Sequence, residues 1–268
     1  MSNRVGLIGS IQQIEKSLSP LIHNAAFLAE GLDWVYEGFP MESLGKELPV
    51  LVAEGVRGAN VTMPHKAAAA SLCGRLSEDA GKIGAVNTLV FEEGQIIGYN
   101  TDGDGFLDAL EKEGWESAGK SVVVIGGGGA GRAIAYALVM AGARVHVCVR
   151  DPSGWSKRHQ LTSDQLTPSD MSEVGRLTKE ANLLVNATPL GQSGEEIPGT
   201  SHMHSSMYVV DLVYGVGETP LMKVARAAGA NANDGLGMLI NQAARSFQIW
   251  TGIDAPVDVM WDAVSEVL

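Results

Sequence analysis

The sequence is poor in cysteine and in long apolar runs, and each shortage excludes a class of protein. Only two cysteines, Cys73 and Cys148, occur among 268 residues, so the chain has neither disulfide density nor the spacing of a metal-ligand set. No apolar run approaches about 18 residues, the length needed to span a membrane. The first ten residues do not have the basic start and long apolar core of a signal peptide. We therefore expect a cytoplasmic protein without a membrane partner.

Positive charge is also scarce. The chain has 19 lysines and arginines against 31 aspartates and glutamates, a formal net charge of −12. Proteins that bind nucleic acid usually carry a basic face, so we expect no nucleic-acid partner. An anionic small molecule would have to be attracted locally, against the overall field. Hydrophobic residues make up 45% of the chain, which is enough to build one large domain or two modest ones.

The clearest pattern is one strand–helix–strand unit between residues 121 and 150. A short apolar run precedes a G-x-G-x-x-G motif, and a helix rich in small residues and a second apolar run follow it. The pieces are the run 122–125, the glycines Gly126, Gly128 and Gly131, the helix 130–142 and the run 145–149. Such glycines allow a tight turn, a close approach of backbone to a pyrophosphate and close packing of helix on strand. This context predicts a dinucleotide site, with a glycine-rich surface turn as the alternative.

The rest of the chain also alternates strands and helices, which predicts an α/β layer structure. Ser19 and Pro20 are expected at the N-cap and first position of a helix. Residues 151–179 have no clear periodicity, with Trp155 and Leu161 as their apolar anchors, and a domain boundary is expected near residues 100–105. Expected strands are 4–9, 34–39, 57–63, 87–91 paired with 95–99 as a hairpin, 183–186 and 208–212; expected helices are 19–31, 44–54, 65–72, 106–113, 219–228, 235–250 and 256–268.

Polar residues follow two of the predicted strands. Asn60-Val61-Thr62-Met63-Pro64-His65-Lys66 ends one strand with a lysine, and Asn100-Thr101-Asp102-Gly103 ends another with an acid. In open α/β sheets ligands bind outside the carboxyl ends of strands, so these clusters are plausible neighbours. Lys66 offers a proton donor, and Asp102 would hold its ammonium group in place. A surface lysine and an aspartate that caps a helix are the alternative, and both interpretations stay open at this point.

Hydroxyl and amide side chains near other strand ends suit a small neutral polyol better than a phosphate. Ser17, Ser19 and Asn87 are of this kind, although each also has a structural explanation as a cap or turn residue. Gln242 lies at the edge of the apolar stripe of its helix and could reach into a cleft, whereas Met238 is more typical of a core. His23 has no second histidine at i+4, so a satisfied core or helix-surface role is expected, and no histidine spacing predicts a catalytic metal.

Taken together, these motifs resemble the shikimate dehydrogenase family, and the similarity runs from Gly6 to about Trp250. Several motifs occur in one order, which is far more specific than any of them alone. They are Ser17-Leu18-Ser19-Pro20 with His23-Asn24, residues 58–66, residues 84–88, Asn100-Thr101-Asp102-Gly103, the glycine motif, Asn186-Ala187-Thr188-Pro189, residues 211–214 and Gly235-Leu236-Gly237-Met238.

The resemblance implies two α/β domains with a cleft between them. Residues 1–101 plus 236–268 would form the substrate domain, and residues 102–235 a Rossmann-type nucleotide-binding domain. The implied reaction is the reversible NADP-dependent reduction of 3-dehydroshikimate to shikimate, a step in aromatic amino acid biosynthesis, by a monomer or a homodimer. Lys66 and Asp102 would be the catalytic dyad, working more readily as an acid because a neighbouring carboxylate favours the ammonium form.

The resemblance also assigns the binding residues. Ser17 and Ser19 would hold the substrate carboxylate, Asn60, Thr62, Asn87 and Asp102 would face its hydroxyl groups, and Tyr214 and Gln242 would close the pocket. The implied cofactor-binding residues are Gly126, Gly128, Gly129, Ala130, Gly131, Arg150, Asp151, Thr188, Gly235 and Met238.

The chain departs from the family where cofactor choice is set. Val149-Arg150-Asp151 replaces the usual Asn-Arg-Thr or Asn-Arg-Ser. Arg150 can pair with the 2′-phosphate of NADP, whereas Asp151, 20 residues after Gly131, stands where an acid usually binds the free 2′-hydroxyl of NAD. Lys157 or Arg158 could offset the acid, so NADP is favoured and NAD is kept as an alternative.

Three other functions compete with this interpretation. An NAD-dependent quinate/shikimate dehydrogenase would use the same motifs and is kept open by Asp151. A catalytically silent dinucleotide sensor would have no need of both Lys66 and Asp102. A dehydrogenase that acts on methylene-tetrahydrofolate is disfavoured by Asn87-Thr88 together with Asn100-Thr101-Asp102-Gly103.

Overall fold

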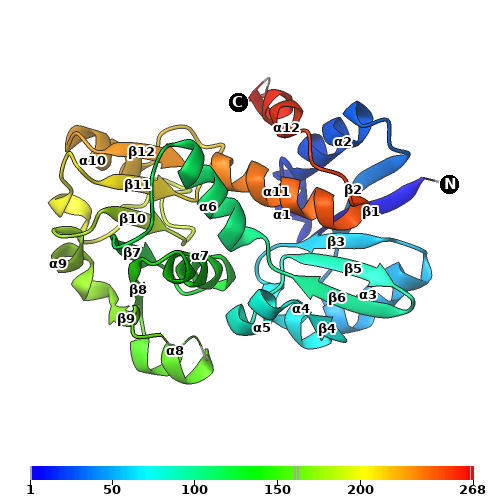
Figure 1. The fold of residues 1–268 in the computed structure, drawn as a ribbon, viewed down its shortest axis with the longest axis horizontal. Helices are drawn as coiled ribbons and strands as arrows, with labels where there is room; N and C mark the ends of the chain where they lie inside the picture. Colours follow the sequence, from blue (N-terminus) through cyan, green and yellow to red (C-terminus); the bar gives the residue numbers. More distant parts are fainter. Residues whose placement is uncertain (1, 160, 162, 266) are drawn as a thin grey trace. The chain divides into compact units, whose positions relative to one another are not determined.

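The computed structural model describes residues 2–159, 161, 163–265 and 267–268, and its contacts divide the chain into two compact units (Figure 1). Unit 1 comprises residues 1–105 together with 239–268, and unit 2 comprises residues 106–238. The two divisions fall inside helices α6 (Asp102–Lys112) and α11 (Leu236–Thr251). Each unit contains a six-stranded sheet within the part of the chain that the structure describes.

The sheet of unit 1 is mixed, and its topology gathers the polar strand ends. Its strands are β1 (Asn3–Gly9), β2 (Trp34–Pro40), β3 (Gly58–Val61), β4 (Arg75–Leu76), β5 (Thr88–Glu92) and β6 (Gln95–Tyr99), in the order β2-β1-β3-β5-β6-β4. Strands β1, β2 and β3 are parallel, and β5 is antiparallel to both β3 and β6, which confirms the predicted hairpin. The end of β3, the start of β5 and the end of β6 therefore lie at one edge of the sheet.

Helices cover both faces of this sheet. Leu44, Leu48 and Leu51 of α3 pack in one cluster with Phe39 of β2. On the opposite face Phe27 of α2 stacks on Phe247 of α11, with ring centroids 5.3 Å apart. The helices of this unit besides α6 and α11 are α1 (Ile11–Glu15), α2 (Ser19–Ala29), α3 (Leu44–Ala53), α4 (Lys66–Leu72), α5 (Glu78–Ile83) and α12 (Val257–Ser265).

A hydrogen bond from Trp250, for which Gly58 leaves room, connects α11 to the sheet of unit 1. The indole N–H of Trp250 donates a hydrogen bond to the Leu89 carbonyl oxygen, 3.0 Å away. A Cβ atom at Gly58 would lie 2.5 Å from that indole nitrogen and 2.4 Å from the Leu89 oxygen. A larger residue than glycine would therefore push α11 away from β3 and β5.

The sheet of unit 2 is parallel throughout. Its strands are β7 (Ser121–Ile125), β8 (Arg144–Val149), β9 (Leu166–Asp170), β10 (Leu183–Asn186), β11 (Tyr208–Asp211) and β12 (Asn231–Asp234), in the order β12-β11-β10-β7-β8-β9. Counted within the unit, this order is 6-5-4-1-2-3, the strand order of dinucleotide-binding Rossmann domains. The predicted α/β fold with a Rossmann-type domain is therefore confirmed.

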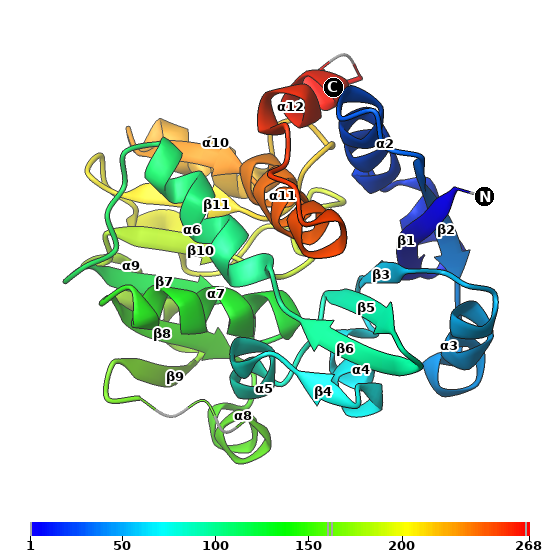
Figure 2. The ribbon, with the colours of Figure 1, turned by 45° about the vertical axis from the view of Figure 1, so that its right-hand side comes forward.

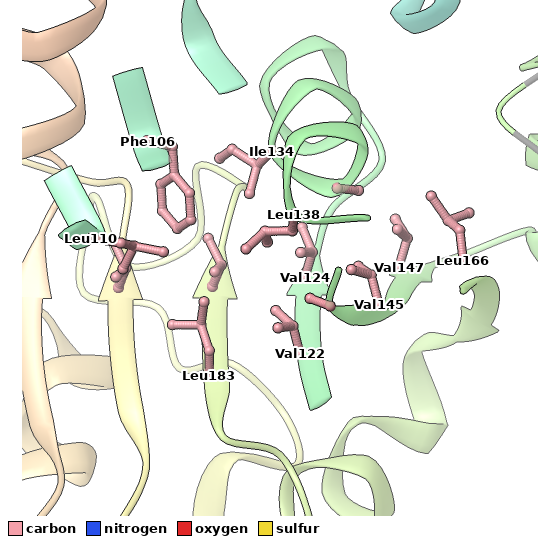
Figure 3. Close-up of a cluster of buried hydrophobic side chains, with 14 of the residues drawn as sticks. Phe106, Leu110, Val122, Val124, Ile134, Leu138, Val145, Val147, Leu166 and Leu183 are labelled. Atoms are coloured by element: carbon pink, nitrogen blue, oxygen red, sulfur yellow. The ribbon is translucent and has the colours of Figure 1, made fainter. Parts of the chain in front are cut away.

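Strand β7 shows why its sequence is apolar throughout. Val122 and Val124 face α6 and α7 (Gly129–Met140), where they meet Ile134 and Leu138 (Figure 3). The alternate residues, Val123 and Ile125, belong to a second cluster on the opposite face. Strands that are buried on both faces read as continuous hydrophobic runs rather than alternating ones.

Different helices contribute to the two clusters, and Figure 2 shows where these helices lie along the sheet. Helices α6 and α7, α8 (Pro152–Arg158) and the start of α11 contribute to the first cluster, and α9 (Val174–Thr178) and α10 (Pro220–Ala227) contribute to the second. The remaining helices of unit 2 are α8 (Pro152–Arg158), α9 (Val174–Thr178), α10 (Pro220–Ala227) and the 3₁₀ turns η1 (Met171–Glu173) and η2 (Thr200–His202).

Some local expectations are wrong. Helix α2 has Leu18, in helical conformation, at its N-cap position, so Ser19 begins the helix instead of capping it. Helix α6 begins at Asp102, four residues before the expected start. Residues 151–179, which lack periodicity, contain α8, β9, η1 and α9. Their two expected anchors, Trp155 and Leu161, are buried as predicted.

Candidate active site

A lysine and an aspartate meet at the polar edge of the unit 1 sheet. Lys66 is the first residue of α4, shortly after β3, and Asp102 is the first residue of α6, shortly after β6. Lys66 Nζ donates to Asp102 Oδ2 at 2.5 Å. The Asp102 side chain is 5% exposed and that of Lys66 is 18% exposed. The pair is thus mostly shielded from water, with the lysine as its more accessible member.

The Asn87 side chain fixes the other oxygen of this carboxylate. Asn87 Nδ2 donates to Asp102 Oδ1 at 2.9 Å. The orientation of the amide follows from its oxygen, because the backbone N–H of Thr101 donates to Asn87 Oδ1 at 2.8 Å. The backbone N–H of Asp102 donates in turn to Asn100 Oδ1 at 3.1 Å. Asp102 is therefore held at its backbone and at both carboxylate oxygens.

Two more of the predicted substrate residues, Asn60 and Gln242, lie in the same network. Gln242 Oε1 accepts from Asn87 Nδ2 at 3.2 Å, and Gln242 Nε2 donates to the Leu239 carbonyl oxygen. Asn60 is buried, and its Oδ1 accepts from the Tyr36 hydroxyl at 2.9 Å. The structure thus brings together Lys66, Asn60, Asn87, Asp102 and Gln242, which come from four separate stretches of sequence.

The other predicted substrate residues of unit 1 lie near the start of α2 and after β3: Ser17 lies between α1 and α2, Ser19 begins α2, and Thr62 follows β3. The Ser19 backbone N–H donates to Ser17 Oγ at 3.2 Å, which holds the two serines next to each other. Thr62 follows β3, and a Cβ atom at Gly9 would lie 2.6 Å from its methyl group. Within the described chain, no hydrogen bond links these three residues to Lys66 or Asp102. Their substrate contacts stay predictions.

Sequence reasoning missed three residues of the buried network: Tyr36, Thr88 as a hydrogen-bonding residue, and Ser246. Ser246 Oγ accepts from Asn60 Nδ2 at 3.0 Å and lies 2.8 Å from Thr88 Oγ1. One signal was available for Ser246, because it lies four residues after Gln242 and therefore on the same face of α11. Tyr36 left no comparable signal, since a tyrosine in a half-buried strand is ordinary.

His23 is buried but is not a satisfied core histidine. Its ring stacks on Tyr36, with centroids 4.5 Å apart and planes 5° from parallel, and it also contacts Trp250. Neither ring nitrogen has a hydrogen-bond partner at bonding distance among the described residues. Burial lowers the pKa of His23 to about 3, an effect that the polar side chain of Asn60 nearby opposes in part. His23 is therefore a neutral aromatic ring at physiological pH.

In unit 2 the glycine motif forms the turn between β7 and α7. Gly126 has a φ of 104°, which side chains rarely adopt. A Cβ atom at Gly131 would lie 2.0 Å from the Gly126 carbonyl oxygen, so this glycine lets α7 pack on the turn. At Gly128 a Cβ atom would meet no atom within 4 Å, and no side chain caps α7 there. The N–H groups of Gly129, Ala130 and Gly131 are thus the first of a helix that begins beside open space, which fits a pyrophosphate.

The segment after β8 engages Asp151 locally. Asp151 caps α8, because its Oδ1 accepts from the Gly154 backbone N–H at 2.9 Å, and its Oδ2 lies 3.6 Å from Arg158 Nη1. The hydrogen bond from Gly154 lowers the pKa of Asp151, with smaller contributions from Ser153 and Arg158. Arg150 is exposed at the carboxyl end of β8. The Asp151 carboxylate, which in the sequence favoured NAD, therefore has a structural role as the cap of α8. Arg150 faces solvent.

The remaining predicted cofactor residues follow β10 and β12. A Cβ atom at Gly126 would lie 2.7 Å from the Thr188 methyl group, so Thr188 borders the glycine turn. Gly235 lies against the backbone of Leu212, whose oxygen would be 2.4 Å from an added Cβ. Met238 is buried in the first cluster of unit 2, and a cofactor contact by its side chain stays a prediction.

Tyr214 follows β11 and is half-buried. Burial raises the pKa of its hydroxyl group. The buried Asp211, at the end of β11, accepts from Asn186 Nδ2 at 2.8 Å, and Asn186 Oδ1 accepts from both the N–H and the hydroxyl of Thr188. This network fixes the loop after β10 relative to β11, on the side of the sheet where the glycine turn lies.

None of the helices in the described residues combines the length and the apolar character that a membrane span requires. No group of three or more histidine, cysteine, aspartate or glutamate side chains gathers in a way that could hold a metal ion, within the same residues.

Fold and site together define a dinucleotide-dependent oxidoreductase of the two-domain α/β class, with a Lys–Asp pair in one unit and a Rossmann sheet in the other. Comparison with known proteins narrows this class, and the chain belongs to the shikimate dehydrogenase family. Residues 7–89 match the model of the shikimate dehydrogenase substrate binding domain, and residues 235–264 match that of the shikimate 5′-dehydrogenase C-terminal domain.

Three relatives illustrate the similarity. A shikimate dehydrogenase (NADP(+)) of Methanopyrus kandleri is 41% identical, over 100% of this chain and 96% of the relative. The crystal structure of shikimate dehydrogenase from Aquifex aeolicus is 36% identical with a TM-score of 0.90, over 98% of this chain and 97% of that one. A quinate dehydrogenase from Corynebacterium glutamicum in complex with NAD is 32% identical with a TM-score of 0.89, over 99% and 98% of the two chains.

Proposed function

We propose that this protein catalyses the reversible, NADP-dependent reduction of 3-dehydroshikimate to shikimate, with Lys66 and Asp102 as its proton-transfer dyad. The observation that carries the proposal is the 2.5 Å contact between Lys66 Nζ and Asp102 Oδ2, at a sheet edge lined with amide side chains. Relatives about 40% identical over nearly their whole length carry the name shikimate dehydrogenase (NADP(+)). The chain is accordingly an oxidoreductase that acts on a CH–OH group.

Lys66 transfers the proton in this reaction. When bound, NADPH supplies the hydride that reduces the carbonyl carbon. The carbonyl oxygen then needs a proton, which the Lys66 ammonium group donates; in the reverse direction the neutral amine takes it back. Asp102 orients the ammonium group through Oδ2, and Asn87 keeps the carboxylate in place through Oδ1. Lys66 is the more exposed member of the pair, which suits the residue that must reach the substrate.

The substrate would bind unit 1. Ser17 and Ser19, which lie next to each other after β1, would hold its carboxylate, and Thr62, Asn87 and Asp102 would face its hydroxyl groups. Asn60 would act from behind this set, because its amide is engaged with buried partners. Gln242 would close the pocket, and a substrate contact of Tyr214, in unit 2, stays a prediction. Hydroxyl and amide groups match the hydrogen-bonding needs of a polyol, and the alcohol group of each serine can donate to a carboxylate.

The cofactor would bind unit 2. The turn Gly126–Gly131 would hold its pyrophosphate, with Thr188, Gly235 and Met238 near the nicotinamide. Arg150, exposed at the end of β8, would take the 2′-phosphate with help from Lys157 or Arg158, while Asp151 stays in its capping role. Residues 1–101 with 236–268 would then be the substrate domain and residues 102–235 the nucleotide-binding domain, in a cytoplasmic monomer or homodimer.

An NAD-dependent quinate/shikimate dehydrogenase is the second candidate. A relative named quinate dehydrogenase, solved with NAD, has a TM-score of 0.89, against 0.90 for the Aquifex aeolicus shikimate dehydrogenase. Asp151 would support this activity if its carboxylate left Gly154 and turned toward the ribose 2′-hydroxyl. The hydrogen bonds that Asp151 makes in the structure favour the first candidate.

Initial rates of nicotinamide reduction by the purified protein distinguish these candidates. Shikimate or quinate is paired with NADP or NAD, and we expect kcat/KM for shikimate with NADP to exceed every other pairing by at least about tenfold. Arg150→Gln should raise KM for NADP about tenfold, the value of one charge-assisted hydrogen bond, and leave KM for NAD unchanged. Arg144→Gln, at the opposite end of the same strand, is the matched control. Equal or higher rates with quinate and NAD would replace the first candidate by the second, and no rate in any pairing would refute both.

A further inference from the structure

A chain of hydrogen bonds runs through the interior of unit 1 and ends on the Asp102 carboxylate. The Tyr36 hydroxyl donates to Asn60 Oδ1 at 2.9 Å, and Asn60 Nδ2 donates to Ser246 Oγ at 3.0 Å and to Thr88 Oγ1 at 3.1 Å. Thr88 Oγ1 donates to Asn87 Oδ1 at 3.0 Å. Asn87 Nδ2 donates to Asp102 Oδ1 at 2.9 Å. All six residues are buried: Tyr36, Asn60, Thr88, Asn87, Asp102 and Ser246.

Every bond in this chain points toward the carboxylate. Asn87 Oδ1 can only accept, so the 3.0 Å bond between Thr88 and Asn87 uses the single hydroxyl proton of Thr88. When this bond forms, Thr88 Oγ1 accepts in its 2.8 Å contact with Ser246, a contact in which either hydroxyl group can donate, and it also accepts from Asn60. If the Ser246 proton turns instead to the Gln242 carbonyl oxygen at 3.0 Å, the direct bond from Asn60 to Thr88 keeps the direction. Thr88 is therefore the member through which both routes pass.

The orientation of the Asn87 amide depends on this arrangement. Its oxygen accepts from the Thr101 backbone N–H at 2.8 Å and from the Thr88 hydroxyl at 3.0 Å, and a longer contact of 3.3 Å comes from the Thr101 hydroxyl. Its nitrogen faces Asp102, Gln242 and the Thr101 hydroxyl oxygen. A flipped amide would point its oxygen at the Asp102 carboxylate and its N–H groups at the Thr101 N–H. Removing the Thr88 hydroxyl takes away the nearer of the two hydroxyl donors that oppose this flip.

We infer that Thr88 is a positioning residue of the dyad, which acts through Asn87 on the Asp102 carboxylate and hence on the Lys66 ammonium group. This inference rests on the proposed function, since it concerns the same proton transfer. A purely structural Thr88 would fill space in β5 and contribute to stability alone. The two roles differ in whether the hydroxyl group, as opposed to the shape of the side chain, is needed for turnover.

The test is a pair of substitutions that separate hydroxyl from shape. Thr88→Val keeps the branched shape and loses the hydroxyl, and Thr88→Ser keeps the hydroxyl and loses a methyl group. We expect Thr88→Val to lower kcat/KM for shikimate about tenfold, with KM for NADP unchanged because the cofactor residues lie in unit 2. Thr88→Ser should recover most of the wild-type value. Thr178→Val is the matched control, because it removes an equally buried hydroxyl in unit 2 that bonds the Val174 carbonyl oxygen.

If the wild-type protein does not oxidise shikimate with NADP, the proposed function fails. The role of Thr88 is judged separately, by comparing the variants with an active wild-type protein. Wild-type kcat/KM in a folded Thr88→Val protein, or an equal loss in Thr88→Val and Thr88→Ser, would overturn the positioning role. An equal loss in Thr178→Val would do the same, by showing that any buried hydroxyl matters. If Thr88→Val does not fold, Thr88→Ala takes its place, because alanine removes the hydroxyl without adding an apolar branch: we expect kcat/KM to fall about tenfold relative to Thr88→Ser, and equal values for Thr88→Ala and Thr88→Ser would overturn the inference.

Discussion

His23 makes the stability of the protein depend on pH. In the unfolded chain its imidazole takes up a proton below about pH 6.5, whereas burial lowers the pKa in the folded protein to about 3. Between these values only the unfolded state binds the proton, so the free energy of unfolding falls as pH falls, by about 1.4 kcal/mol per pH unit. Above about pH 6.5 the two states are equally unprotonated, and His23 adds no pH dependence.

Chemical denaturation of His23→Leu beside the wild type measures this effect. Leucine keeps an apolar side chain of similar size and loses no hydrogen bond, because neither ring nitrogen has a partner at bonding distance in the part of the chain described. The wild type should lose about 2 kcal/mol more than the variant between pH 6 and pH 4.5. The carboxylates common to both proteins cancel in the comparison. Parallel curves for the two proteins would contradict the buried neutral histidine.

Single residues of the candidate site could be proposed from the sequence more easily than their hydrogen-bond partners. Lys66 and Asp102 could be paired because each follows a strand, and strand ends of one direction share an edge of the sheet. Asn87 and Gln242 were expected near the substrate, and the structure adds that each contacts the other. Tyr36 could not be found from the sequence, because a buried hydroxyl has a role only through neighbours that the fold supplies. Ser246 could be found only through its spacing of four residues from Gln242.

At the scale of elements, the turn between β7 and α7 gives two glycines opposite roles. A Cβ at Gly131 would lie 2.0 Å from a backbone oxygen, whereas a Cβ at Gly128 would meet no protein atom within 4 Å. We expect Gly131→Ala to destabilise the protein by about 1–3 kcal/mol, because the turn must shift. Gly128→Ala should leave the melting temperature unchanged but raise the Kd for NADP at least about tenfold, because its methyl group would occupy the space for the pyrophosphate.

Thermal melts and cofactor titrations of both variants check this pair. Equal NADP affinity in Gly128→Ala and the wild type would show that the pyrophosphate does not approach this turn. The two substitutions are chemically identical and three residues apart, so each serves as the control for the other.

Elements with strong periodicity or strong flanking signals were predictable, and short polar ones were not. The runs 122–125 and 183–186 read as strands because both of their faces are buried. Strand β9 escaped notice because its sequence, Leu-Thr-Pro-Ser-Asp, has few apolar residues and lies at the edge of the sheet. Strand β12, Asn-Ala-Asn-Asp, was missed for the same reason: it is polar and lies at the other edge of the sheet. Such edge strands gain their conformation from pairing with a neighbour, which local sequence does not reveal.

At the scale of the molecule, we expect the two ligands to bind different units. Hydrogen exchange can test this, because a ligand that binds only the folded form protects the amides whose opening it opposes, by about 2.7 kcal/mol at 100 times Kd. NADP alone should slow exchange in residues 121–140 of unit 2 and leave residues 58–66 and 87–102 of unit 1 unchanged. Shikimate alone should do the reverse. Protection of unit 2 alone by shikimate would contradict the assignment.

The most direct test of the central claim is the turnover number for 3-dehydroshikimate reduction after Lys66→Gln. Glutamine keeps a polar side chain of similar length but has no ammonium proton to donate. We expect kcat to fall by at least about a hundredfold, the usual value of general acid catalysis, while the Kd for NADPH stays within about twofold. Lys82→Gln, which changes an exposed lysine of the same unit, should keep the wild-type kcat. A Lys66→Gln protein that keeps more than about a tenth of the wild-type kcat would contradict the Lys66–Asp102 dyad as the site of proton transfer.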